Sequence, residues 1–168
     1  MTMNKGLYIF GEVLFDVFPD GHKVLGGAPF NVAWHLQAFA QSPFFISRIG
    51  NDAEGEQIRK AMLGWGMDSR ALQTDEKLST GKVIIQIKDG EPEYDIIEPA
   101  AYDAIDVLPE NISACDFLYH GSLAVRNEVS YQCLKRLKAL KPKNVFVDVN
   151  LRDPWWHKSV VLELLQQA

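Results

Sequence analysis

Short apolar runs of strand length alternate along this chain with segments whose apolar residues recur at helical spacing. The strand-like runs are Leu7–Phe10, Phe44–Ile49, Phe117–His120 and Val145–Val149. The helix-like segments are Phe30–Ala40, Ala53–Leu63, Glu128–Leu140 and Trp156–Gln167. This alternation is typical of parallel strands that form a sheet covered by helices. The sequence therefore predicts an α/β fold of the Rossmann type, with a doubly wound, mostly parallel sheet.

Two pairs of extended segments interrupt this alternation. The four segments are Leu14–Phe18, Lys23–Leu25, Val83–Lys88 and Glu93–Ile97. Asp20-Gly21 joins the first pair and Asp89-Gly90 joins the second, and Asp-Gly between extended runs is a strong signal for a hairpin turn. We expect two antiparallel hairpins, at about residues 13–25 and 81–98, to form a small β lid beside the main sheet.

Composition limits the classes of partner. The chain has 168 residues, 47% of them hydrophobic and 23% charged, which suits one globular domain. The net charge is −5 and the basic residues are scattered, so we expect no nucleic-acid partner. No apolar stretch approaches the roughly 20 residues that span a bilayer, so we expect no membrane association either.

The cysteines and histidines indicate neither a disulfide framework nor a metal site. Cys115 and Cys133 each lie in an apolar-periodic segment, which favours buried thiols in a reducing cytoplasm. The four histidines show no metal-ligand spacing. We therefore expect a cytoplasmic protein without a metal centre of its own.

Polar residues follow each predicted strand of the main sheet. They are Gly11-Glu12 with Asp16, Gly50-Asn51-Asp52, His120-Gly121-Ser122 and Asp148-Val149-Asn150-Leu151-Arg152. In open α/β sheets, ligands bind beyond the carboxyl ends of the strands. Glycine allows close approach to the backbone, while carboxylate, amide and guanidinium groups form hydrogen bonds. The pattern indicates a site for a polar small molecule.

Each motif also has a purely structural explanation. Asp148, Asn150 and Arg152 share one side if the strand continues that far, but an ordinary polar strand exit with a helix-capping Asp148 explains them as well. Gly26-Gly27 could present backbone N–H groups to a ligand, or could be a plain turn into a helix. Asn31, in the first turn of that helix, is harder to explain by structure alone.

Taken together, the motifs resemble a known family. Three of them resemble the first signature region of the PfkB (ribokinase-like) carbohydrate kinases: Gly11-Glu12-x-x-x-Asp16, Gly26-Gly27-Ala28-Pro29-x-Asn31-x-Ala33 and Arg48-Ile49-Gly50-Asn51-Asp52-x-x-Gly55. Two later ones are similar to the fructokinase branch: Gly121-Ser122-Leu123-Ala124-x-Arg126 and Asp148-x-Asn150-Leu151-Arg152. The resemblance covers essentially the whole chain in the right order. It implies a ribokinase-like fold and an ATP-dependent kinase acting on a ketose such as fructose.

The resemblance implies roles for particular residues. Asp16 would accept hydrogen bonds from two sugar hydroxyls, and Asn31 and the Gly26-Gly27 backbone would complete the sugar contacts. Asn150 and Arg152 would face the phosphoryl-transfer path, where a guanidinium offsets developing negative charge.

Two further residues keep alternative roles. Arg126 would assist at the sugar site or would pair with Asp148, and both roles fit the sequence. Tyr94, on a lid strand, would cover the sugar, although a core or interface tyrosine is the simpler interpretation.

The family places its catalytic aspartate in a Gly-Ala-Gly-Asp turn, in a second half that also holds ATP. These 168 residues contain no such turn; Gly64-Trp65-Gly66-Met67-Asp68 comes nearest and is typical of a helix end. We therefore expect residues 1–168 to be a sugar-binding N-terminal part whose ATP-binding C-terminal part is absent. ATP and Mg²⁺ would belong to the full-length protein, and the chain alone would not transfer phosphate.

Two other functions compete with a sugar kinase. One is a non-catalytic sugar-binding or regulatory fragment without an ATP site. The other is a nucleotide-binding domain of an oxidoreductase, but the chain has no Gly-x-Gly-x-x-Gly. We also expect a homo-oligomer, formed either through the lid or through the exposed edge of the strand near Val145–Val149.

Overall fold

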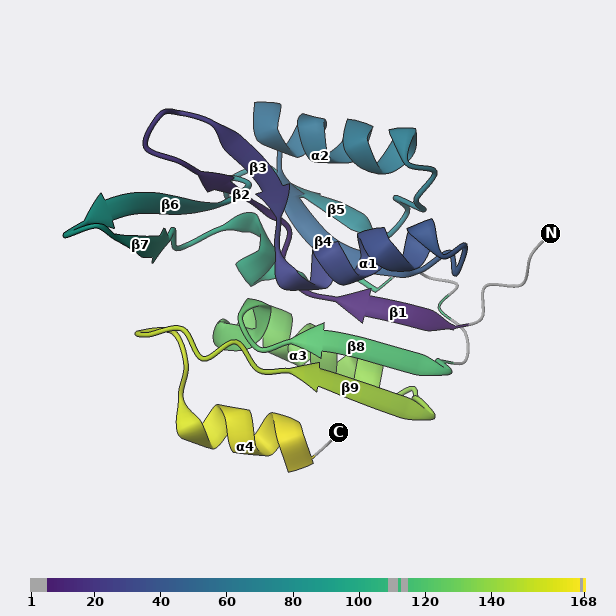
Figure 1. Cartoon of the computed structure of the whole chain (residues 1–168). Helices are drawn as coiled ribbons and strands as arrows, with labels where there is room; N and C mark the ends of the chain where they lie inside the picture. Colours follow the sequence, from purple (N-terminus) through teal and green to yellow (C-terminus); the bar gives the residue numbers. More distant parts are fainter. Residues whose placement is uncertain (1–5, 109–111, 113–114, 167) are drawn as a thin grey trace.

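A computed structural model describes residues 6–108, 112, 115–166 and 168 of the chain. Its centre is a five-stranded sheet in the order β5-β4-β1-β8-β9, and every neighbouring pair in it is parallel (Figure 1). The strands are β1 (Leu7–Phe10), β4 (Phe44–Gly50), β5 (Leu72–Asp75), β8 (Phe117–Gly121) and β9 (Asn144–Asp148). The predicted α/β fold with a doubly wound, mostly parallel sheet is confirmed.

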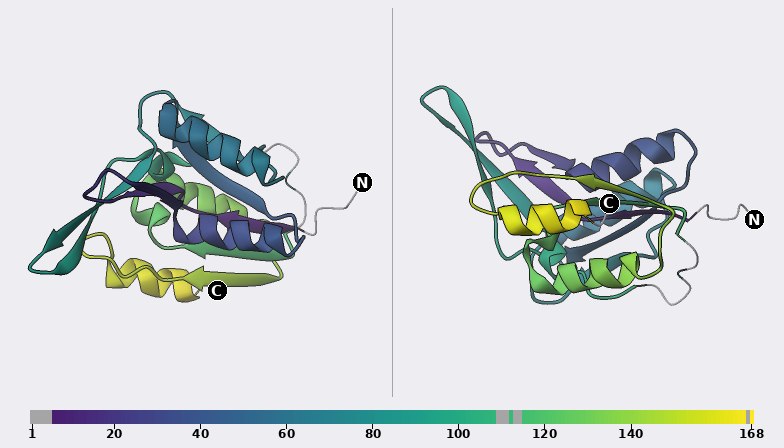
Figure 2. Two further views of the ribbon diagram at one scale, coloured as in Figure 1. Left: turned by 45° about the horizontal axis from the view of Figure 1, so that its top comes forward. Right: turned by 90° about the horizontal axis from the view of Figure 1, so that it is seen from below.

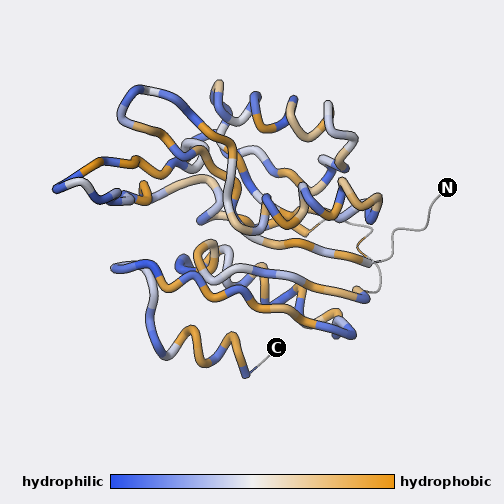
Figure 3. The backbone as a smooth tube through the Cα atoms, viewed as in Figure 1, coloured by the Kyte–Doolittle hydropathy of each residue, from blue (hydrophilic) through white to orange (hydrophobic). Residues whose placement is uncertain are grey.

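Helices cover both faces of this sheet (Figures 1 and 2). On one face, α1 (Ala28–Ala38) and α2 (Ala53–Gly64) bury Phe30 and Ile58 against strand residues such as Phe45. On the other, α3 (Glu128–Lys138) and α4 (Lys158–Gln166) contribute to a second apolar cluster with β1 and β8. Figure 3 shows hydrophobic residues along the central strands and hydrophilic ones at the tip of the β6–β7 hairpin.

The structure shortens the predicted last helix and contains a strand that the sequence did not predict. The predicted last helix, Trp156–Gln167, begins at Lys158, because Trp156 instead donates its indole N–H to Asp153 in the preceding turn (2.8 Å). Gln167 lies outside the described residues. The strand β5 was missed altogether, since only Leu72 in Leu72–Asp75 is apolar.

The two predicted hairpins form a single small sheet. Their strands are β2 (Leu14–Val17), β3 (Lys23–Gly26), β6 (Gly81–Lys88) and β7 (Glu91–Ile96), in the order β3-β2-β6-β7. Both hairpins pair antiparallel, as predicted, whereas the two hairpins join each other through the parallel pair β2 and β6. This mixed sheet, called the lid here, projects beyond the carboxyl ends of the central strands (Figures 1 and 2).

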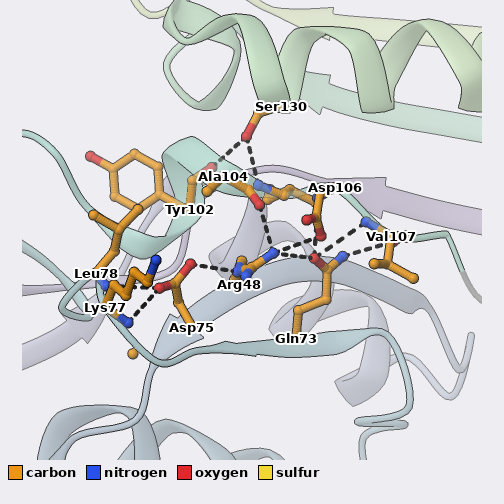
Figure 4. Close-up of polar contacts among 12 residues, drawn as sticks. Arg48, Gln73, Asp75, Lys77, Leu78, Tyr102, Ala104, Asp106, Val107 and Ser130 are labelled. Atoms are coloured by element: carbon orange, nitrogen blue, oxygen red, sulfur yellow. Dashed lines mark hydrogen bonds and ion pairs between the residues drawn. The ribbon is translucent and has the colours of Figure 1, made fainter.

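A polar network fixes β5 and the segment that follows the lid (Figure 4). Arg48 of β4 lies 2.9 Å from a carboxylate oxygen of Asp75 and 2.6 Å from one of Asp106. Its guanidinium also donates to the carbonyl oxygen of Ala104 (2.9 Å). Ala104 ends η1 (Ala101–Ala104), a short 3-10 helix, so the network attaches η1 to the central sheet.

Candidate sugar site

One cavity of about 260 Å³ lies where the end of β1, the start of α1, the lid and the segment after β9 meet. Its lining residues are Glu12, Leu14, Asp16, Gly27, Ala28, Asn31, Val83, Tyr94, Ile96, Leu123, Asn150 and Arg152. Six of the eight residues named from the sequence therefore share one cavity. Asp16 and Asn31, which are 15 residues apart in the chain, both face it. The cavity volume is close to the lower end of small-molecule sites, roughly 300–1,000 Å³.

The paired glycines have different tasks. Gly27 lines the cavity with φ near 107°, and a Cβ there would lie 2.7 Å from the carbonyl oxygen of Glu12. Both the backbone angle and the close contact therefore require glycine. Gly26 does not line the cavity; it backs Asp16, because a Cβ at Gly26 would lie 3.3 Å from an Asp16 carboxylate oxygen.

Asp16 enters the cavity from the lid. It lies on β2, paired with Val24 of β3, and is partly buried. Burial raises the pKa of its carboxyl above the usual value, and the positive charge of Arg152 partly offsets that shift. Asp16 and Arg152 thus present an acceptor and a cation to the same cavity.

Asn150 and Arg152 reach the cavity from a turn, not from a strand. Of the two explanations left open by the sequence, the strand exit holds, since β9 ends at Asp148. The backbone N–H of Asn150 donates to Ser122 Oγ (2.8 Å), and Arg152 Nε donates to Asn150 Oδ1 (3.2 Å). Asp148 caps no helix here; its carboxylate accepts a hydrogen bond from the Tyr119 hydroxyl (2.5 Å).

Tyr94 is not a core residue. Its side chain is about half exposed on β7 and lines the cavity. The guanidinium carbon of Arg152 lies 5.2 Å from the centre of its ring, within the range of a cation–π contact. Tyr94 and Arg152 therefore meet across the cavity mouth, one from the lid and one from the turn after β9.

Arg126 does not line this cavity. It pairs with Asp103, at 2.8 Å and 2.9 Å, so the alternative pairing with Asp148 was wrong. It lines a smaller neighbouring cavity of about 40 Å³ together with Asn150 and Trp155.

Glu12 is a cavity residue to which the sequence analysis gave no role. Its side chain is 1% exposed and its Oε2 has no hydrogen-bond partner. Burial raises the pKa of this carboxyl to about 7, with a smaller contribution from the negative charge of Asp148. The signal in the sequence was an acid directly after a buried apolar strand, a position where a charged side chain is costly.

Another acid at a strand end has a structural task. Asp52 accepts hydrogen bonds from Gly55 N, Thr80 N and Thr80 Oγ1, at 2.8, 2.8 and 2.6 Å. Burial alone would raise its pKa, but the hydrogen bonds from Thr80 and Gly55 outweigh burial and lower it. Asp52 thus caps α2 and ties it to the base of the lid.

No group of three or more His, Cys, Asp or Glu side chains is placed to hold a metal ion among the described residues. Nor does that part of the chain contain a helix with the length and apolarity to cross a membrane.

An α/β fold with a polar cavity at the carboxyl ends of its parallel strands is typical of domains that bind small molecules. Residues 11–168 match the pfkB family of carbohydrate kinases, and the chain belongs to that family.

Individual relatives are consistent with this assignment. A fructokinase of Escherichia coli is 28% identical over 181 residues, covering 99% of this chain and 58% of its own length. An uncharacterized sugar kinase of Pyrococcus horikoshii is 30% identical over 150 residues, covering 85% of this chain and 48% of its own. The chain spans about half the length of the curated relatives it matches.

Solved structures have the same fold. The crystal structure of that Pyrococcus horikoshii kinase superposes with a TM-score of 0.79 at 26% identity, over 96% of this chain and 60% of the other. Fructokinase from Xylella fastidiosa with bound ATP gives a TM-score of 0.84 at 21% identity, over 99% of this chain and 56% of the other. At that identity the second comparison supports the fold alone.

Proposed function

We propose that this chain is the sugar-binding part of an ATP-dependent sugar kinase of the fructokinase type, which transfers the γ-phosphate of ATP to a hydroxyl of a ketose such as fructose. The observation that carries the proposal is the convergence of Asp16, Asn31, Asn150 and Arg152 on one cavity. The fructokinases among the relatives support the substrate class.

Each residue has a chemical task in this proposal. The Asp16 carboxylate accepts hydrogen bonds from sugar hydroxyls, and the Asn31 amide can both donate and accept. The Arg152 guanidinium provides positive charge beside the hydroxyl that receives the phosphate. Tyr94 covers the sugar from the lid and limits the access of water.

ATP and Mg²⁺ belong to the proposal for the whole protein. The Pyrococcus horikoshii kinase has been solved with ATP, and a Vibrio cholerae fructokinase with fructose, ADP and calcium. The described residues of this chain gather no carboxylate set that fits a divalent ion. We therefore assign no step of the reaction to a metal-holding residue of this chain.

Replacing Asp16 with alanine is expected to weaken fructose binding by roughly 10- to 100-fold. Hydrogen bonds to a charged acceptor contribute about 1.5–3 kcal/mol each, and every 1.4 kcal/mol corresponds to about tenfold. Saturation-transfer NMR and calorimetry with fructose measure the affinity, and the former detects weak complexes.

Asp20→Asn is the matched control, because Asp20 lies in the turn of the same β2–β3 hairpin and bonds only the His22 backbone among the contacts found. Equal affinities of wild type and Asp16→Ala would argue against the assigned site. Binding of NAD in place of any sugar would favour an oxidoreductase domain instead. Sugar binding by a full-length protein that never phosphorylates the sugar would favour the regulatory alternative.

We also propose that the protein self-associates, through the lid or through the edge strand β9. Phe146 on β9 is 54% exposed, although its ring stacks on that of Tyr119. Small-angle scattering is expected to give the mass of a dimer or larger species. Phe146→Lys should shift that mass toward the monomer if β9 forms the contact, and should leave it unchanged if the lid does. A monomeric wild type contradicts the proposal.

A further inference from the structure

Arg126 is held rigidly beneath the sugar cavity. It ends η2 (Ala124–Arg126), and its side chain is 4% exposed. The Nε and Nη2 groups donate to the two oxygens of Asp103, which is 1% exposed. Asp103 is itself fixed, because it accepts a hydrogen bond from the backbone N–H of Ala100 (2.9 Å). A buried two-point pair of this kind leaves the guanidinium little freedom.

Contacts from the same guanidinium extend in two directions. Its carbon lies 4.6 Å from the centre of the Trp155 ring and 5.4 Å from that of Tyr102. Its Nη2 also donates to the carbonyl oxygen of Ile97 (3.3 Å) and to the Tyr102 hydroxyl (3.2 Å). Arg126 therefore joins Trp155, in the segment after β9, to the segment from Ile97 to Asp103.

Trp155 belongs to the turn that carries two cavity residues. Its backbone N–H donates to the carbonyl oxygen of Arg152 (2.8 Å), and the N–H of Arg152 donates to that of Asn150 (3.0 Å). A shift of the Trp155 ring therefore moves the backbone that presents Asn150 and Arg152 to the cavity.

Ile97 and Tyr102 lie at the base of the lid. Ile97 follows β7, the strand of Tyr94, and its N–H donates to the carbonyl oxygen of Lys82 on β6 (3.0 Å). The Tyr102 ring packs so closely on Gly81 that a Cβ there would lie 2.5 Å from it. Arg126 thus contacts the residues next to both groups that meet over the cavity. Ile97 and Tyr102 lie near the strand of Tyr94, and Trp155 lies in the segment of Arg152.

We propose that Arg126 is a positioning residue that sets the spacing between the lid and the Asn150–Arg152 turn, and that it does not contact the sugar. The inference rests on the proposed function, because the cavity between these two parts is the proposed sugar site. The resemblance implied that Arg126 could assist at the sugar site, whereas this proposal makes it a residue that positions other groups.

Trp155→Ala tests this inference and leaves the buried ion pair of Arg126 and Asp103 in place. Loss of a largely desolvated cation–π contact is expected to weaken fructose binding by about tenfold. Trp156→Ala is the matched control, because Trp156 bonds Asp153 and has no stacking contact with Arg126 among the described interactions. Arg126→Lys keeps the charge but not the two-point geometry, and should weaken binding similarly.

Two readouts separate positioning from a general loss of structure. In an Arg152→Ala background, Trp155→Ala should cause a smaller loss of affinity, because one of the two groups that it positions is already gone. Independently of any sugar, the NMR signal of the Arg152 Nε–H should move toward its solvent-exposed position in Trp155→Ala and stay unchanged in Trp156→Ala.

Either of two results overturns the inference. One is that Trp155→Ala lowers fructose affinity equally in the wild type and in the Arg152→Ala variant. Trp155 would then act independently of Arg152, while the proposed sugar site would still stand. The other is an unshifted Arg152 Nε–H signal in Trp155→Ala. A wild-type chain that binds no fructose contradicts the proposed function, whereas the Arg152 signal still tests the positioning role.

Discussion

Glu12→Gln is expected to make the protein more stable than the wild type by about 3 kcal/mol at pH 8, and to leave stability almost unchanged near pH 4.5. The folded protein holds the Glu12 proton up to about pH 7, whereas the unfolded chain releases it near 4.5. The contribution of the protonated Glu12 carboxyl to the free energy of unfolding is fully present below pH 4.5. It is lost as pH rises to 7, by about 1.4 kcal/mol per pH unit. Glutamine resembles the protonated acid and does not titrate.

Urea unfolding of both proteins between pH 4.5 and 8 measures this difference. Glu54→Gln is a suitable comparison, because hydrogen bonds from Lys23 and then Lys82 lower the pKa of Glu54 to about 2. Glu54 is therefore ionised in folded and unfolded chains above about pH 5.5, and its substitution should change stability by a constant amount in that range. A constant difference for Glu12→Gln as well would show that Glu12 is ionised in the folded protein.

Gly55→Ala is expected to lower the free energy of unfolding by about 3 kcal/mol, the upper part of the range for overpacked sites. Gly55 lies in the first turn of α2, and a Cβ there would lie 2.2 Å from the carbonyl oxygen of Gly50. That oxygen belongs to the end of β4, and the hydroxyl of Thr80 would also lie 3.0 Å away. Backbone, not a flexible side chain, would have to move.

Gly64→Ala, in the last turn of the same helix, provides the control. A Cβ at Gly64 has no neighbour within 4 Å, so alanine should stabilise the helix by roughly 0.4–1 kcal/mol. Thermal or urea unfolding of the two variants compares them directly. If both substitutions are equally mild, α2 does not approach β4 as closely as the structure indicates.

Local signals predicted most of the elements. Largely apolar runs such as Phe44–Ile49 form parallel strands because both of their faces are buried, and Pro29 marks the first turn of α1. Asp-Gly placed both hairpin turns. These features depend on residues close together in the chain, so the sequence is sufficient to read them.

Elements that depend on distant partners were missed or misjudged. β5 is too polar to be recognised locally and forms because it pairs with β4, where Arg48 holds Asp75. The parallel pairing of β2 with β6 joins segments more than 60 residues apart, so the turns could not predict it. The period-2 spacing of Asp148, Asn150 and Arg152 suggested a strand where the chain forms a turn.

By itself, the sequence predicted most of the strands and helices in their order, and the set of polar residues from which a sugar site could be built. Only the tertiary structure decided which of them share the cavity, that Arg126 pairs with Asp103 outside it, and that burial raises the pKa of Glu12 to about 7. The reason is physical: burial, charge pairing and protonation depend on groups that folding brings together from distant parts of the chain.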